Sequence, residues 1–106
     1  MTNNELFKIY MNYQFEHAAP NTYYGRVNIL KNHFMIDYGE FSPPDITASD
    51  INQIYDEMEE NGYANNTIYG LYAALQSFFK MAAEYGEIIT NPVKTARTIR
   101  PTKNNK

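Results

Sequence analysis

The sequence predicts an all-α domain built around four helices, and three observations support this prediction. Apolar side chains recur over four separate segments at the i, i+3, i+4 spacing that places them on one face of a helix. No run alternates between apolar and polar residues with the period of two that is typical of a half-buried strand. Proline or glycine separates the segments, at Pro20, Gly39, Gly62 and Gly86.

The first two predicted helices meet at Pro20. The first covers about residues 4–17 with Asn3 or Asn4 as its cap, and the second begins at Pro20 or one residue later, because proline disfavours helical geometry at the residue before it. We expect Gly39 to end the second helix in the left-handed conformation. The expected buried positions of the two helices are Leu6, Ile9, Tyr10, Tyr13, Tyr23, Val27, Leu30 and Phe34.

Two further helices follow a loop that contains two consecutive prolines. Thr47 is expected to cap the third helix, since Asp50 lies three residues later as in a capping box, and Gly62 ends it. The fourth and longest helix opens at Asn65 or Asn66 and closes before the last glycine. The expected buried positions of these helices are Ile51, Ile54, Tyr55, Met58, Ile68, Leu71, Tyr72, Leu75, Phe79 and Ala82.

The predicted bundle occupies residues 1–93, and a basic linker follows it at 94–106. Asn91 and Pro92 are expected to begin one short turn just before this boundary. After it the chain is polar and has basic residues but no acidic ones, which is typical of a linker. The basic residues of this segment are Lys94, Arg97, Arg100, Lys103 and Lys106.

Composition excludes several classes of protein. The chain of 106 residues has the length of one domain. It has no cysteine, which excludes disulfides, thiolate metal sites and a cysteine nucleophile, and is consistent with a cytoplasmic protein. His17 and His33 lack partners at ligand spacing, so we expect neither a metal nor a cofactor. No apolar run is long enough for a membrane span and no signal peptide is visible, so we expect no membrane partner.

Charge is distributed unevenly around the net value of −3. Residues 45–60 carry six acidic side chains and no basic ones, whereas residues 17–36 and 61–83 contain no acid. The third predicted helix is therefore acidic, while the second and fourth are weakly basic. Because the local field decides where a polyanion can bind, the negative total does not exclude nucleic acid as a partner.

The most informative feature is an internal repeat. Residues 21–30 align without gaps on residues 66–75, and both predicted helices begin Asn-Thr-x-Tyr-Gly-x4-Leu-x3-Phe. Two copies are too few for a solenoid, but they predict two helix starts of the same shape. The first turn of a helix offers free N–H groups, and the side chains of Asn and Thr either cap these groups or add hydrogen bonds to a phosphate.

Gly25 and Gly70 occupy the second turn of each copy, where glycine costs about 1 kcal/mol relative to alanine. The missing side chain is useful if something approaches closely, and either a phosphate backbone or a neighbouring helix would meet this requirement. The exposed positions of both helices lack acids. They are Tyr24, Asn28 and Lys31 with Arg26 at the flank, and Tyr69, Ala73, Gln76 and Lys80.

The order of these motifs resembles the N-terminal core-binding (SAM-like) domain of phage integrases and related tyrosine recombinases. The resemblance covers roughly residues 6–101. It is carried by helix patterns whose order and spacing are moderately specific. The residues that carry it are Asn21-Thr22, Leu30, Phe34, Asp45-Ile46-Thr47, Asp50-Ile51, Asn66-Thr67-Ile68, Phe78-Phe79-Lys80-Met81-Ala82, Glu84, Gly86, Ile88-Ile89 and Asn91-Pro92-Val93.

The resemblance implies a four-helix bundle, like the N-terminal domain of lambda integrase, that forms one half of a clamp around double-stranded DNA. A separate C-terminal catalytic domain of the same polypeptide would close the clamp for integration or excision, and neighbouring recombinase protomers are further possible partners. The second and fourth helices would face the major groove, and the linker would cross the DNA backbone. The DNA-binding residues that it implies are Thr22, Tyr24, Arg26, Lys31, Asn66, Thr67, Tyr69, Gly70, Lys80, Lys94, Arg97 and Arg100.

The chain lacks the catalytic residues of that family. Only three arginines and two histidines are present, and no His-x-x-Arg motif is followed by an isolated tyrosine. We therefore expect no enzymatic activity from this chain alone and read its ten tyrosines as packing residues. The alternative is a helical protein–protein interaction module that uses the acidic third helix, in which case the repeat would serve folding only.

Overall fold

The computed structural model describes residues 1–102, and in this range the protein is entirely helical. The helices are α1 (Asn3–His17), α2 (Pro20–Leu30), α3 (Ile36–Tyr38), α4 (Ala48–Glu60), α5 (Asn65–Glu84) and α6 (Pro92–Thr95). A π-helical segment, η1 (Lys31–Met35), joins α2 to α3 without a break, and a 3-10 turn, η2 (Pro43–Asp45), precedes α4. The predicted all-α class is confirmed.

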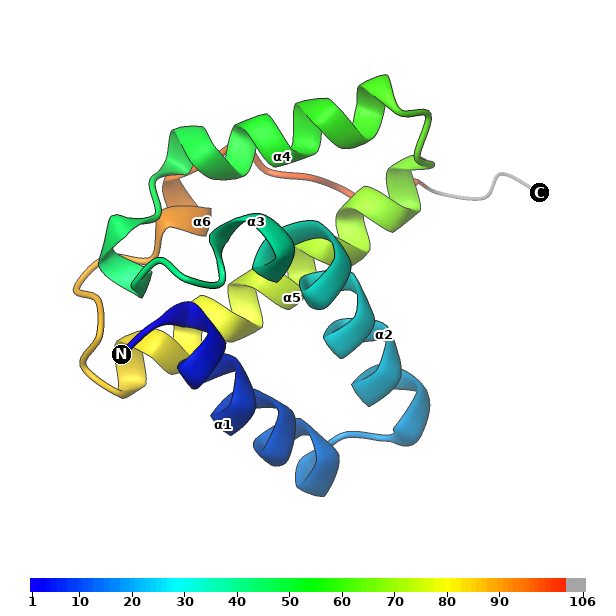
Figure 1. Ribbon diagram of the computed structural model, residues 1–106. Coiled ribbons are helices and arrows are strands. Elements are labelled where there is room, and N and C mark those ends of the chain that lie inside the picture. The colour runs from blue at the N-terminus through cyan, green and yellow to red at the C-terminus, as the bar shows by residue number, and fades with distance from the viewer. Residues whose placement is uncertain (103–106) are drawn as a thin grey trace.

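The longest helix, α5, runs through the middle of the molecule (Figure 1). The pair α1 and α2 packs on one side of it, and α4 with α6 packs on the other. The fully buried side chains from α5 are Ile68, Leu71, Ala74, Leu75, Phe78, Phe79 and Ala82, so this helix supplies a large part of the core. Every other long helix buries its apolar face against α5.

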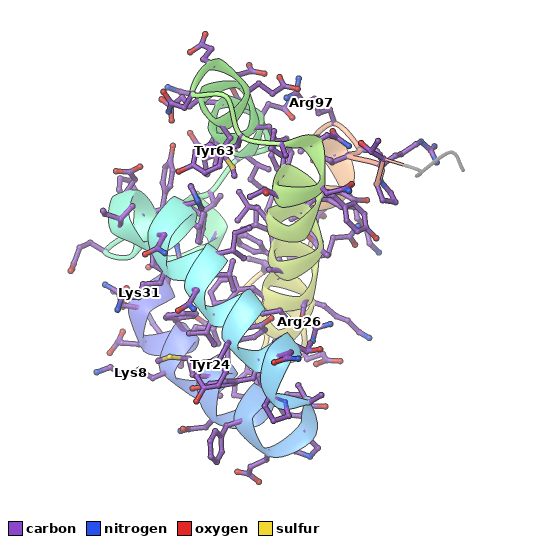
Figure 2. All side chains as sticks on the ribbon, turned by 90° about the vertical axis from the view of Figure 1, so that its right-hand side faces the viewer. Lys8, Tyr24, Arg26, Lys31, Tyr63 and Arg97 are labelled. Atoms are coloured by element: carbon purple, nitrogen blue, oxygen red, sulfur yellow. The ribbon has the colours of Figure 1, made fainter. Side chains whose placement is uncertain are left out.

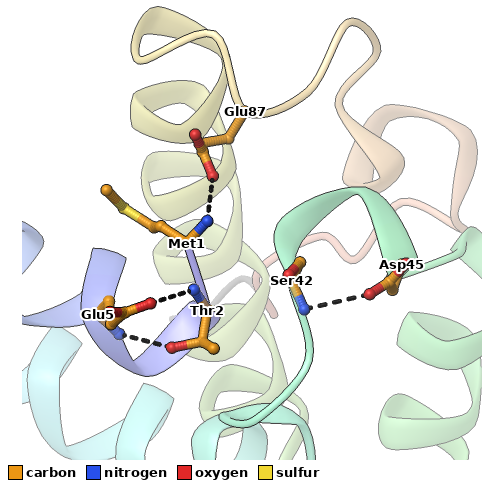
Figure 3. Close-up of polar contacts among 6 residues, drawn as sticks. All are labelled: Met1, Thr2, Glu5, Ser42, Asp45 and Glu87. Carbon is orange, nitrogen blue, oxygen red and sulfur yellow. Dashed lines mark hydrogen bonds and ion pairs between the residues drawn. The ribbon is translucent and has the colours of Figure 1, made fainter.

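Capping boxes fix the starts of two long helices. Thr47 and Asp50 form the predicted box at α4, with hydrogen bonds of 3.0 and 3.1 Å. At α1 the cap is Thr2 with Glu5 as its partner (Figure 3), and not Asn3 or Asn4 as predicted. Hydrogen bonding by the Thr2 backbone N–H, and to a smaller extent by the Thr2 side chain, lowers the pKa of the Glu5 carboxyl. A similar bond from the Ser42 N–H to Asp45 closes η2 (Figure 3).

Gly39 does not have the predicted left-handed conformation. Its φ is −61°, and the chain continues through it without a reversal of handedness. A Cβ at this position would lie 2.6 Å from the Met35 carbonyl oxygen and would also overlap the Asn4 side chain. Gly39 is therefore required for the close approach of α1. The predicted helix ends at Gly62 and Gly86 are confirmed, and both glycines have the left-handed conformation, with φ of 84° and 75°.

One predicted core position in α1 is wrong. Tyr13 is 54% exposed, whereas its neighbour Gln14 is only 5% exposed. The ring of Tyr13 stacks on His17 at the surface, and the Gln14 side chain accepts a hydrogen bond from Arg26 of α2. A buried amide with a hydrogen-bond partner costs little, so the polar Gln14 is buried next to the Tyr13 that helical spacing assigned to the core.

The boundary at residue 93 and the linker after it need correction. Ala96 and Ile99 are 6% and 7% exposed and belong to the hydrophobic core. Residues 94–102, here called the C-terminal tail, pack along α4 and α5 instead of leaving the bundle. The packing of this segment could not be predicted from the sequence, because only one side chain in three is buried and the residues between are polar or basic. Lys103 and Lys106 lie outside the described residues.

Candidate nucleic-acid interface

The repeated sequence produces two helix starts of the same geometry. The residue before each helix is an alanine, with φ −61° and ψ 149° at Ala19 and φ −63° and ψ 147° at Ala64. Neither start has a side-chain cap, so the first N–H groups of α2 and α5 are not used by the side chains of the repeat. The prediction of two equal starts is confirmed, whereas capping by the repeated Asn or Thr is not observed.

The two starts lie far apart, because α2 crosses α5 and begins low in both views, whereas α5 begins high (Figures 1 and 2). Arg26, in the second half of α2, lines a groove with Lys80 and Glu84 from the end of α5. Ile29, one turn later in α2, lies beside Gly70 in the second turn of α5. The two helix starts therefore do not meet at one point, and contact of both starts with one polyanion stays a prediction.

The glycines of the repeat are not explained by tight helix packing. A Cβ on Gly25 would have no atom within 4 Å outside its own helix. A Cβ on Gly70 would meet only Ile29, at an ordinary contact distance of 3.5 Å. Of the two reasons that the sequence left open for these glycines, packing against a neighbouring helix therefore fails at Gly25, and space for an external partner remains.

The outward side of α5 forms an acid-free ridge of Tyr69, Ala73, Gln76 and Lys80. Lys80 is exposed, while the other three side chains are half-buried between the flanking elements. One groove beside Lys80 has a volume of about 410 Å³ and is also lined by Arg26 of α2. A second groove, of about 550 Å³, is lined by Lys80 together with Gln76 and Lys94. The two grooves therefore place three cations at the Lys80 end of the ridge: Lys80 itself, Arg26 of α2 and Lys94 of α6.

These cations are not neutralised within the protein. Ion pairs in residues 1–102 involve only the Met1 amino group and Arg97, so Arg26, Lys80 and Lys94 lack a carboxylate partner. Glu84 lines the first groove and is the acid nearest to this surface among the groove residues. The result is a surface with a positive local field on a protein whose total charge is negative.

The remaining predicted contacts on α2 lie elsewhere on that helix. Thr22 and Tyr24 are exposed near its start. In Figure 2, Lys31 projects on the same side as Lys8 of α1, whereas Arg26 lies on the side of α5. The structure thus brings Arg26 together with Lys80 but does not bring Lys31 to the ridge. Contact of DNA with Thr22, Tyr24 and Lys31 stays a prediction.

The predicted contacts at the start of α5 are partly occupied by the C-terminal tail. The Asn65 side chain donates to the Arg100 carbonyl oxygen at 2.7 Å, and the Asn66 side chain accepts from the Thr102 N–H at 2.7 Å. Thr67 and Tyr69 follow on the same helix and are half-buried. Asn66 was expected to face a phosphate, and in the structure it holds the tail instead.

Arg97, one of the predicted DNA contacts, lies against α4. Its guanidinium forms ion pairs with Asp56 at 3.1 Å and Glu59 at 2.9 Å, both on the acidic helix α4, and lies 5.7 Å from the centre of the Tyr55 ring. Burial raises the pKa of the Tyr55 hydroxyl, with Tyr72 adding to the effect and Arg97 opposing it. Because its charge is matched by two carboxylates, Arg97 is better placed to hold the tail than to bind a polyanion. Arg100 is exposed.

Ser77 is a polar residue of this surface that sequence reasoning missed. It lines both grooves beside Lys80, one helical turn before that lysine, and its hydroxyl oxygen accepts a hydrogen bond from Tyr10 at 3.1 Å. Its place beside Lys80 could have been predicted, because residues three apart lie on the same face of a helix. Its hydrogen bond with Tyr10 could not, because the two residues are far apart in the sequence.

Other kinds of site have no support in residues 1–102. No group of three or more His, Cys, Asp or Glu side chains in this range could hold a metal ion. Within the same range, no helix is both long and apolar enough to cross a membrane. Comparisons of the chain with protein-family models, with curated proteins and with solved structures find no match.

Proposed function

We propose that this chain binds double-stranded DNA as the core-binding (SAM-like) domain of a site-specific tyrosine recombinase. In this proposal it clamps the duplex for a catalytic domain elsewhere in the same polypeptide and carries out no chemistry itself. The observation that carries the proposal is the acid-free ridge of α5, with the unpaired cations Arg26, Lys80 and Lys94 grouped around it.

The side chains of the ridge suit contacts with the major groove and with the phosphates beside it. Gln76 has the donor and acceptor pair that recognises adenine, and the flanking cations can neutralise phosphates on either side of the groove. The ridge supplies direct base contacts from its middle and backbone contacts from its edges.

The proposal differs in one respect from the interpretation of the sequence alone. The two repeated helix starts lie far apart (Figures 1 and 2), and the start of α5 is partly covered by the C-terminal tail. The side of α5, and not its N-terminus, is therefore the proposed contact surface. The resemblance to recombinase domains supports the identity of the partner, and the charge distribution supports the face that it would contact.

Fluorescence anisotropy with a labelled duplex over a series of salt concentrations tests the proposal. Binding should weaken as salt rises, with a slope of log K against log salt of about −0.9 for each phosphate neutralised. Lys80→Glu and Lys94→Glu should each weaken binding by about tenfold or more at low salt. Lys8→Glu on α1 makes the same change in net charge away from the ridge and should have a much smaller effect.

The alternative function would give a different result. A protein-interaction module that uses the acidic α4 would leave its amide spectrum unchanged by duplex DNA even at low salt. Absence of binding at low salt, or chemical shift changes restricted to α4, would overturn the DNA-binding proposal. Equal losses for Lys80→Glu and Lys8→Glu would overturn the ridge as its contact surface.

A further inference from the structure

The groove between α1, α2 and α5 brings together hydrogen-bond donors from helices that are distant in the sequence. Its volume is about 410 Å³, and its lining includes Gln14, Arg26, Ser77, Lys80 and Glu84. Two of these side chains are cations without an ion-pair partner, and one is an anion. The groove therefore keeps a net positive charge and is large enough for a group of several heavy atoms.

Arg26 is held in place by a buried amide. Its guanidinium donates from one terminal nitrogen to the Gln14 side-chain oxygen at 2.7 Å, and Gln14 is only 5% exposed. A guanidinium has five N–H donors in a fixed plane, so most of them remain free for a ligand. Anchoring by Gln14 reduces the entropy lost when these donors bind, because the side chain is already ordered.

Ser77 is oriented by Tyr10 in a similar way. The Tyr10 hydroxyl donates to the Ser77 oxygen at 3.1 Å, and Tyr10 is 1% exposed. Burial raises the pKa of Tyr10, against smaller opposing effects of Ser77 and Arg26, so the phenol keeps its proton and remains the donor. The hydrogen of the Ser77 hydroxyl is then available to a ligand in the groove, one helical turn from the Lys80 ammonium group.

We propose that this groove binds one phosphate group between the Arg26 guanidinium, the Ser77 hydroxyl and the Lys80 ammonium. Charged and neutral donors around a single point are the chemistry that a phosphate oxygen accepts. The inference rests on the proposed function for the source of that phosphate, which is a phosphodiester of the DNA backbone. Inorganic phosphate has the same chemistry, and the experiment below separates the two sources.

Glu84→Gln is the most direct test, because it removes the only carboxylate that residues 1–102 contribute to the groove and leaves the three donors intact. Duplex affinity at low salt should rise about three- to tenfold, since a like charge near the phosphate is removed. Glu60→Gln, on the exposed surface of α4, makes the same change in net charge and is the matched control. An equal gain for both variants would show an effect of net charge alone and would overturn the groove assignment.

Lys80→Gln tests the contact from the opposite direction. The magnitude of the salt slope for duplex binding should fall by about 0.9, because one phosphate contact is lost. Ser77→Ala should lower duplex affinity without changing the slope, since it removes a neutral donor, and a thermal melt checks that the variant stays folded. Duplex binding with unchanged slope in Lys80→Gln would overturn the groove while the proposed function stands.

Inorganic phosphate identifies the source. At millimolar phosphate, NMR signals of the Arg26 side-chain N–H and of the Ser77 and Lys80 amides should shift, and duplex DNA should shift the same signals. Shifts with phosphate but no binding of duplex would support the groove and overturn the proposed function. Absence of shifts at these residues with either ligand would overturn the groove assignment.

Discussion

The starts of α2 and α5 share a sequence motif and a backbone geometry, yet their surroundings differ. At α5 the side chains of Asn65 and Asn66 hold the C-terminal tail through three hydrogen bonds. At α2 the equivalent Asn21 is exposed and forms no hydrogen bond within the described residues. The motif therefore sets the local conformation of a helix start, and a distant segment decides whether that start is accessible.

The largest expected effect concerns the tail that covers the start of α5. Ile99→Ala should lower the free energy of unfolding by about 2–5 kcal/mol, because Ile99 is 7% exposed and its removal leaves a cavity in the core. Urea denaturation measures this change. Ile89→Ala is the matched control, since Ile89 is fully exposed and its truncation should change stability by about 0.5 kcal/mol or less. Equal effects would mean that the tail does not pack on the bundle.

A smaller change in stability, of the opposite sign, is expected for a substitution in the second turn of α2. Gly25→Ala should raise the free energy of unfolding by about 1 kcal/mol, because alanine is the better helix former and the added methyl group meets nothing. Thermal denaturation with Gly39→Ala as the comparison checks this, since a Cβ at Gly39 would overlap the Met35 carbonyl and should destabilise the protein. Destabilisation by Gly25→Ala would show that the start of α2 is packed after all.

The smallest expected effect compares the equivalent asparagines directly. Asn66→Ala should cost about 0.5–1.5 kcal/mol, because the Thr102 N–H loses its acceptor, whereas Asn21→Ala should change stability by about 0.5 kcal/mol or less. Amide hydrogen exchange at Thr102 provides a local readout and should become faster only in Asn66→Ala. Faster exchange in both variants would contradict the difference between the two starts.

The fold was largely predictable because helices are encoded by local patterns. The capping box at Thr47, the proline at the start of α2 and the left-handed Gly62 and Gly86 act over a few residues, and the structure contains all of them. Gly39 was misassigned because its role is steric and depends on Asn4, which is remote in the sequence. A glycine in the sequence indicates a special backbone position, but it does not distinguish a left-handed conformation from a close contact with another element.

The candidate site was predictable in part. The acid-free side of α5 follows from helical spacing, so Tyr69, Gln76 and Lys80 could be placed on one ridge from the sequence. The neighbours of that ridge could not, because they depend on how helices pack. Arg26 lies beside the ridge because α2 packs on α5, while the charge of Arg97 is matched by two carboxylates of α4.

The sequence by itself determined the helices, their ends, the repeated starts and the acid-free sides, because each of these depends on interactions within a few residues or on helical periodicity. Only the tertiary structure decided that the two starts lie far apart, that residues 94–102 belong to the bundle, and that Arg26, Ser77 and Lys80 share a groove. These features depend on which apolar faces bury one another. Which faces pack together depends on the whole core and cannot be predicted from any one segment.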